Sequence, residues 1–288
     1  MAMDARNSVR SIAVSQDGKW IVAGTQSGLV AVWDENGRES FKFKAHSGLE
    51  MLMGDRAVYA LDVSSKGRIA TGSASIVRVW SMTTRVRLLD LRLPKNFLSR
   101  TVHSTVKYSP SGRLLAISRS TDSFLSGDFS DLRVYDSWEN GRLLVFIQIH
   151  LRSLAWTSDS KQLFSLSHDG NILCLDVYSG ETLSEWRIHG NNEHTCIALS
   201  RDDRFIAATA DSSVSLWDTS THQQIGSVHH SLHIHTLAFS ENHLMIGGRT
   251  KITLWPFCPS SPCADNHVGG SALRHLVPSS HLGLLERA

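Results

Sequence analysis

The densest group of possible metal ligands in the chain is a run of histidines at His229, His230, His233 and His235. Imidazole is a common ligand for zinc and related ions. No cysteine or acidic residue lies within six positions before His229. The pair Cys258 and Cys263 supplies only half of the four ligands that a structural zinc site needs. We therefore expect no metal site and no cofactor.

The sequence contains no Gly-rich phosphate loop of the GxxxxGK type, no GxSxG and no HExxH. Its most basic stretch is interleaved with Leu88, Leu89, Leu91 and Phe97 and consists of Arg85, Arg87, Arg92, Lys95 and Arg100. Nucleic-acid binding needs such a stripe with stacking aromatics. An outer strand with solvated arginines explains this basic stretch with fewer assumptions than nucleic-acid binding does. The charge balance, 29 Lys and Arg against 27 Asp and Glu, implies neither a polyanion partner nor a membrane surface.

The elements that must position these residues are internal repeats. Residues 9–34 form three alternating apolar runs separated by turns at Gln16-Asp17-Gly18 and Ser27-Gly28 and ending in Trp33-Asp34. The same phrase returns five times, and its closing residues are Trp33, Trp80, Tyr135, Leu175, Trp217 and Trp255. A period in the forties with short alternating strands is typical of a propeller blade and not of a helical repeat. Stacking such blades around an axis buries the faces that one repeat leaves exposed.

These residues resemble the WD-repeat β-propeller family, which is named for its Trp-Asp pair. Trp33-Asp34 and Trp217-Asp218 carry the pair intact, whereas Tyr135-Asp136 and Leu175-Asp176 keep only the acid. The first repeat is also similar to the propeller arms of fungal signalling proteins. The resemblance covers about residues 9–256 and implies an all-β propeller with six recognisable blades.

The resemblance also implies a buried polar network in each blade, in which a histidine, a hydroxyl and an aspartate fix the tryptophan. The best match is the fifth repeat, with His189, Asp211, Trp217 and Thr209 near the hydroxyl position. The fourth repeat keeps Ser165 and Asp169 but has Leu175 in place of tryptophan. Trp33, Asp34, Trp80 and Trp255 complete the set of expected structural residues.

The expected domain is a propeller over residues 1–258, followed by a loosely ordered tail over residues 259–288. Its repeats span about 9–34, 58–81, 104–136, 151–176, 194–218 and 234–256. The third repeat carries a polar insertion near 119–131 that reads as a surface loop. Only eight residues precede the first strand, and three prolines follow Trp255 closely, so a six-bladed ring that closes imperfectly and a fragment of a longer propeller both remain open.

An active propeller enzyme should place several carboxylates on the inner strands. The six predicted inner strands contain one, Asp62. We therefore expect no enzyme, with a hydrolase-like or lactonase-like propeller and a nucleic-acid-associated propeller as the alternatives.

Propellers of this family bind peptides and domains on a broad face built from one set of loops. The equivalent positions just after each inner strand begins are Arg10, Tyr59, Ser104, Arg152, Thr195 and His235. The turns at Gln26, Ser75 and His168 lie on the same predicted rim. Arginine and tyrosine are enriched among interface hot spots, so we expect a scaffold that binds proteins or peptides.

We expect no small-molecule substrate, nucleic acid or membrane among its partners. Four scattered cysteines, the lack of an Asn-x-Ser/Thr sequon and the lack of a signal pattern point to the cytoplasm, with the nucleus as the alternative. The sequence names neither the partner nor the pathway.

Overall fold

The computed structural model describes eleven segments of the chain, and every structural statement below concerns these segments. They are residues 8–46, 56–73, 76–93, 99–123, 129–167, 169–188, 196–210, 212–229, 234–241, 243–248 and 252–256. The chain divides into two compact units, residues 1–187 and residues 188–288. The predicted tail, residues 259–288, lies outside the described segments.

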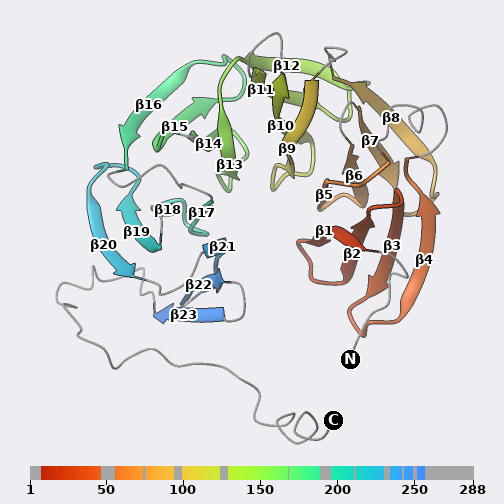
Figure 1. Cartoon of the computed structure of the whole chain (residues 1–288), viewed down its shortest axis with the longest axis horizontal. Coiled ribbons are helices and arrows are strands. Elements are labelled where there is room, and N and C mark those ends of the chain that lie inside the picture. The colour runs from red at the N-terminus through yellow and green to blue at the C-terminus, as the bar shows by residue number, and fades with distance from the viewer. Residues whose placement is uncertain are drawn as a thin grey trace, which may run out of the picture. The chain divides into compact units, whose positions relative to one another are not determined.

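The first unit contains four antiparallel blades, each a four-stranded sheet in which strands adjacent in the chain are hydrogen-bonded (Figure 1). Blade 1 is β1 (Val9–Val14), β2 (Trp20–Thr25), β3 (Leu29–Asp34) and β4 (Glu39–Lys44). Blade 2 is β5 (Ala60–Val63), β6 (Arg68–Gly72), β7 (Ile76–Ser81) and β8 (Arg87–Arg92). Blade 3 is β9 (Ser99–Tyr108), β10 (Leu114–Ser123), β11 (Phe129–Asp136) and β12 (Arg142–Ile147). Blade 4 is β13 (Leu151–Trp156), β14 (Gln162–Ser167), β15 (Asn171–Asp176) and β16 (Thr182–Arg187).

The second unit contains two blades of the same connectivity. Blade 5 is β17 (Ile197–Leu199), β18 (Phe205–Ala210), β19 (Ser213–Asp218) and β20 (Gln224–His229). Blade 6 is β21 (Ile234–Phe239), β22 (His243–Gly248) and β23 (Ile252–Pro256). The fold class is therefore confirmed: the protein is an all-β propeller with six blades. The described segments contain no helix with the length and hydrophobicity needed to cross a membrane.

Each blade has two ends that matter for function. At what we call the upper end, the first strand begins and the second strand turns into the third. At the lower end lie the turn from the first to the second strand and the turn from the third to the fourth. The predicted rim residues belong to the upper end.

The first lower turn has the same construction in every blade. A hydroxyl residue directly follows the first strand, and its side chain accepts a hydrogen bond from the backbone N–H of the residue that starts the second strand. These residues are Ser15, Ser64, Ser109, Thr157, Ser200 and Ser240. Such serine and threonine caps satisfy backbone donors that the sheet leaves unpaired, so the six turns are fixed alike.

Two boundaries differ from the sequence prediction. The polar insertion near 119–131 is not a loop over most of its length, because β10 continues to Ser123 and β11 begins at Phe129. Its serines and threonines pair in the ladder, for example Ser120 with Ser130 and Thr121 with Phe129. β9 accordingly begins at Ser99, five residues before the predicted start at Ser104. Polarity suggested a loop, but an alternating run of Ser and Thr is equally suited to an extended hairpin.

Buried aliphatic side chains between neighbouring blades form the core of each unit. The cluster between blades 1 and 2 is centred on Val22, Val32, Val58 and Ile69, all of them fully buried. Blades 2 and 3, blades 3 and 4, and blades 5 and 6 enclose comparable clusters. Contact is so close beside Val58 that a Cβ on Gly24 would lie 2.5 Å from its Cγ1. Glycine is therefore required at this point of β2.

Candidate protein-interaction surface

Several predicted rim residues lie at irregularities of the first strand of their blades. The register shifts between Val9 and Ser11, between Leu151 and Ser153, and between Ile234 and Thr236. The residue inside each shift is Arg10, Arg152 or His235. A β-bulge redirects the side chain of its extra residue and bends the strand. Three repeats thus turn the equivalent side chain out of the regular pleat.

The clearest contact on the rim joins two predicted residues of blade 1. Arg10 Nη2 donates to Gln26 Oε1 at 2.9 Å, and both side chains are exposed. In blade 2 the ring of Tyr59 is 45% exposed, and its backbone N–H donates to Gly72 O at 2.9 Å. The main chain of Tyr59 is therefore held while a large part of the phenol remains accessible.

Other rim residues are placed differently or lie outside the described segments. Ser104 pairs in register with Arg119, and the irregularity of β9 lies between its partners at Ser120 and Thr121. The longer hairpin of blade 3 thus moves the bulge away from Ser104. Thr195, Ser75 and His168 lie outside the described residues.

A buried histidine–threonine–tryptophan network is formed in blade 2, where sequence reasoning did not find it. His46 Nε2 and Thr71 Oγ1 share a hydrogen bond of 3.1 Å, and Trp80 Nε1 donates to the same hydroxyl at 3.1 Å. Burial, and then the positive charge of Arg78, lower the pKa of His46 from 6.5 to about 4. The imidazole ring is therefore neutral near pH 7 and contributes to the network as an uncharged hydrogen-bonding group.

The fifth blade uses another hydroxyl. Trp217 Nε1 donates to Ser215 Oγ at 2.8 Å, whereas Thr209 Oγ1 accepts from Cys196 N at 3.0 Å. The two blades differ because successive side chains of a strand point to opposite faces of the sheet. Thr71 lies two residues beyond Ile69, the partner of Trp80, but Thr209 lies three beyond Ile206, the partner of Trp217. The side chain of Thr209 consequently projects from the opposite face of the sheet.

In the fourth blade Ser165 lies at the position that Thr71 occupies in blade 2. It is fully buried, and its Oγ has no hydrogen-bond partner among the residues that the structure describes. Leu175 stands where the tryptophan would donate, and His150, at the position of His46, instead shares a 2.9 Å bond with Ser130. Asp169 is exposed in the turn between β14 and β15. His189 and Asp211 lie outside the described residues.

The tryptophans predicted in the first and last repeats both pack against hydrophobic clusters of their blades. Trp33 is 4% exposed within blade 1, in a cluster with Ala23 and Ala31. The ring of Trp255 packs against Gly226 and belongs to the core between blades 5 and 6.

The aspartate of each Trp-Asp position builds the lower turn between the third and fourth strands. Its carboxylate accepts two backbone N–H groups of the next few residues at Asp34, Asp136, Asp176 and Asp218. At Asp218 the hydroxyl of Ser220 is the largest influence, followed by the backbone of Thr221, and together they lower the pKa to about 2. The acid of the pair is therefore retained in blades 3 and 4 because the turn needs it, even where the aromatic partner has changed.

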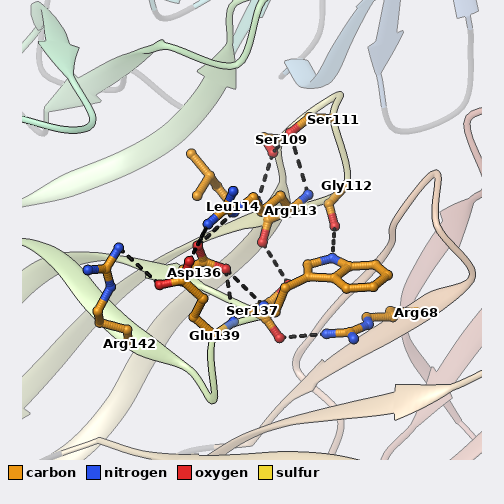
Figure 2. Close-up of polar contacts among 11 residues, drawn as sticks. Arg68, Ser109, Ser111, Gly112, Arg113, Leu114, Asp136, Ser137, Glu139 and Arg142 are labelled. Carbon is orange, nitrogen blue, oxygen red and sulfur yellow. Dashed lines mark hydrogen bonds and ion pairs between the residues drawn. The ribbon is translucent and has the colours of Figure 1, made fainter.

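Blade 3 adds an ion-pair cluster to this turn (Figure 2). Arg113 Nε donates to Asp136 Oδ2 at 2.7 Å, and Arg113 Nη2 lies 2.6 Å from Glu139 Oε1. Glu139 Oε2 also lies 3.1 Å from Arg142 Nη2. Burial raises the pKa of Asp136, but the bond from Arg113 and the backbone bonds outweigh it and lower the pKa overall. The carboxylates and guanidinium groups of this cluster neutralise one another.

Beside this cluster stands an exposed tryptophan that the sequence reasoning missed. Trp138 is 50% exposed, and its Nε1 donates to Gly112 O at 3.1 Å. Arg68 reaches across from blade 2, donates to Ser137 O, and places its Cζ 3.9 Å from the centre of the indole ring. Figure 2 shows Arg68 joined to Ser137. The signal was available: an aromatic residue two positions after a turn-forming aspartate cannot lie in the sheet core.

Asp62, the carboxylate predicted on the inner strands, has a structural contact. Its Oδ2 accepts from the backbone N–H of Tyr108 in blade 3 at 2.6 Å, and burial raises its pKa. Within the described residues no three His, Cys, Asp or Glu side chains lie close enough together to hold a metal ion. His229 and His235 of the histidine run are described, whereas His230 and His233 are not.

Two family models match the chain. A model described as the WD domain, G-beta repeat, matches residues 3–34, and one described as the anaphase-promoting complex subunit 4 WD40 domain matches residues 106–202. Over these residues the chain is similar to WD-repeat β-propellers. The two matched regions cover β1 to β3 of blade 1, blade 3 from residue 106 onward, all of blade 4 and the first strand of blade 5, in agreement with the repeats read from the sequence.

Curated relatives of this chain are substantially longer. Periodic tryptophan protein 2 homolog of Dictyostelium discoideum is 25% identical over 228 residues, which cover 76% of this chain and 22% of that protein. Protein hir1 of Emericella nidulans is 25% identical over 180 residues, covering 56% and 17%. Myosin heavy chain kinase C of Dictyostelium discoideum is 31% identical over 107 residues, covering 36% and 14%. The chain thus spans about a fifth of the length of the relatives it matches.

Proposed function

We propose that this chain is a non-catalytic scaffold that binds other proteins or peptides through the upper ends of its blades. The observation that carries the proposal is the repeated presentation of an arginine, tyrosine or histidine where the first strand begins, in blades 1, 2, 4 and 6. Arg10, Arg152 and His235 lie at bulges, and Tyr59 is anchored through its backbone. Arginine and tyrosine supply hot-spot energy in protein interfaces far more often than their abundance suggests.

Bonds between neighbouring blades stabilise these strands before any partner arrives. Ser11 Oγ donates to Val58 O at 2.8 Å, joining blade 1 to blade 2. Tyr108 N donates to Asp62, joining blade 3 to blade 2, and Trp156 Nε1 donates to Lys107 O at 3.1 Å, joining blade 4 to blade 3. A surface that is ordered in advance loses less conformational entropy on binding. The first strands of the first unit are therefore fastened to one another, near the rim between blades 1 and 2 and near the lower end between blades 2, 3 and 4.

The test is affinity capture of the full chain followed by quantitative mass spectrometry. The rim variant combines Arg10→Ala, Tyr59→Ala and Arg152→Ala. A matched control combines Arg87→Ala, Phe146→Ala and Arg201→Ala, which removes two arginines and one aromatic residue whose side chains are 51%, 51% and 89% exposed away from the rim.

We expect the specific partners of the wild-type chain to decrease about tenfold or more with the rim variant and to persist with the control. Partners that survive the rim variant at unchanged abundance would refute the assignment of the binding face. Circular dichroism and thermal melts of both variants establish that the fold is retained.

A further inference from the structure

Each blade has two broad faces, and neighbouring blades pack face to face. We call the face toward the preceding blade in the chain the leading face and the face toward the following blade the trailing face. The leading face of blade 2 packs on the trailing face of blade 1 (Figure 1). On its first strand and the residues just before it, this leading face consists of Val58, Leu61 and Val63, which are 0%, 8% and 5% exposed.

The same three positions of blade 1 are exposed. They are Val9, Ile12 and Val14, which precede Ser15 by six, three and one residues, as Val58, Leu61 and Val63 precede Ser64. Ser15 and Ser64 are the equivalent capping residues of the two lower turns. Val9, Ile12 and Val14 are 48%, 64% and 56% exposed. We call these three residues the leading patch.

The leading patch points away from blade 2. Ser11 Oγ donates to the backbone of blade 2 at 2.8 Å, and Ala13 packs in the cluster with blade 2. Because successive side chains of a strand point to opposite faces, Ile12 and Val14 lie on the face away from blade 2. Farther out on that face Trp33 is 4% exposed, so the uncovered part lies at the inner strand β1.

Blade 6 has an uncovered trailing face. Leu244, Ile246 and Trp255 belong to the core with blade 5, so the residues that alternate with them point to the opposite face. These are Ala238, Met245, Ile252 and Leu254. Ala238 and Ile252 are exposed, Ile252 to 62%, whereas Met245 and Leu254 are half-buried. We call these four residues the trailing patch.

The trailing patch occupies the positions with which blade 1 covers blade 2. The matching residues, by strand register, are Met245 and Val22, Leu254 and Val32, and Ile252 and Val30. All three valines are 0% exposed, in the cluster that also contains Val58 and Leu61. The chain therefore exposes both halves of an interface that it builds internally between blades 1 and 2.

We propose that the leading patch of one chain binds the trailing patch of a second copy of this chain. The contact repeats the packing of blade 1 on blade 2. Contiguous exposed apolar side chains mark sites of protein contact, and burying them is favourable. Because the two patches differ, the interface is heterologous, so each chain can bind one neighbour through each patch. The inference does not rest on the proposed function, since no rim residue belongs to either patch.

Other occupants fit these two patches less well. Neither patch contains a charged side chain, so an acidic peptide or a nucleic acid finds no ionic partner in them. Two leading patches could also meet in a symmetric dimer. Within the chain, however, the leading face of blade 2 meets a trailing face, and the trailing patch repeats that trailing face position by position.

The test is sedimentation velocity of the full chain from about 1 to about 100 μM, the range in which a micromolar contact is measured. Ile12→Asp and Ile252→Asp each place a charge in one patch, at side chains that are 64% and 62% exposed. The matched control is Leu183→Asp, which places the same charge at a 50% exposed aliphatic residue of the outer strand β16. Circular dichroism melts establish that each variant keeps the fold.

We expect the average mass of the wild-type chain to rise with concentration above the 31.9 kDa of one copy. Ile12→Asp and Ile252→Asp should each weaken association about tenfold or more, and Leu183→Asp should change it less than about twofold. An equimolar mixture of the two patch variants retains one intact leading patch and one intact trailing patch. The mixture should therefore form a one-to-one dimer that does not grow further.

Four results would overturn the proposal. The first is a wild-type chain that stays monomeric at every concentration, which assigns the patches to another occupant. The second is association that Ile12→Asp abolishes and Ile252→Asp leaves unchanged, which is the result of two leading patches meeting. The third is equal weakening by Leu183→Asp, and the fourth is a mixture of the two patch variants that forms no dimer.

Discussion

The same strand position is filled by a bonded hydroxyl in blade 2 and by an unbonded one in blade 4, and removing each should have opposite consequences. Thr71 Oγ1 bonds His46 Nε2 and Trp80 Nε1, both at 3.1 Å, in a site with no solvent access to the threonine. Thr71→Val preserves the shape of the side chain but deletes both bonds, together with the longer bond of 3.4 Å that the hydroxyl donates to Arg78 O. A net hydrogen bond contributes about 1 kcal/mol, and stranding a buried donor adds to that loss. We expect Thr71→Val to lower the free energy of unfolding by about 2 to 4 kcal/mol.

Ser165→Ala is the matched partner of that variant. Ser165 Oγ is buried without a hydrogen-bond partner in the described segments, so its removal relieves a desolvation cost and breaks no bond there. We expect no loss of stability and a gain of up to about 1 kcal/mol. Replacing the serine also leaves only a small void, because alanine differs by one oxygen atom.

Urea unfolding followed by tryptophan fluorescence and circular dichroism measures both variants under one set of conditions. For a domain of this size, each kcal/mol corresponds to roughly 2 to 4 °C in Tm. The two variants should differ by about 2 to 5 kcal/mol, so the Tm of Thr71→Val should lie about 4 to 20 °C below that of Ser165→Ala. Equal stabilities, or a Ser165→Ala variant less stable than Thr71→Val, would refute the assignment of the network to blade 2.

Two further predictions concern acid stability and packing between blades. The pKa of His46 is about 4 in the folded chain and 6.5 in the unfolded chain. Between these two pH values the unfolded chain binds one proton that the folded chain does not bind. The free energy of unfolding should therefore fall by about 3 kcal/mol as the pH drops from 6.5 to about 4. His46→Gln should flatten this part of the stability profile, whereas the exposed control His150→Gln should retain it; a slope unchanged in His46→Gln would contradict the buried neutral ring. Gly24→Ala places a Cβ 2.5 Å from Val58 Cγ1 and should cost about 1 to 3 kcal/mol, whereas Gly226→Ala meets its nearest atom, in Trp255, at 3.5 Å and should change stability by less than about 0.5 kcal/mol. Chemical unfolding compares the two variants, and a similar loss in both would argue against close contact at Gly24.

The repeats and their turns could be predicted because short-range chemistry determines them. Alternating apolar residues and turn glycines such as Gly18 and Gly112 mark strand boundaries without knowledge of distant contacts. The equivalent positions Arg10, Tyr59 and Arg152 could be aligned for the same reason. The bulges that redirect Arg10 and Arg152 could not, since a register shift depends on the partner strand.

The blade 2 network was missed because its members are far apart in the sequence. His46 lies 14 residues before β5 begins at Ala60, so it does not stand next to the strand that it supports. In blade 5 the predicted hydroxyl, Thr209, lies one residue away from the position equivalent to Thr71. A shift of one residue along a strand moves the side chain to the opposite face of the sheet. Trp138 was not predicted because the sequence reasoning placed candidate binding residues on the upper loops and none on the lower turns.

The most direct measurement of the central claim is hydrogen–deuterium exchange of the full chain with and without its captured partner. A scaffold that binds through its upper rim predicts slower exchange on complex formation at residues 8–10, 25–28, 56–59 and 151–153, where the first strands begin and the β2–β3 turn lies. Exchange in the outer strands β4, β8 and β12 should remain unchanged. Protection confined to those outer strands, with none at the beginnings of the first strands, would contradict the account.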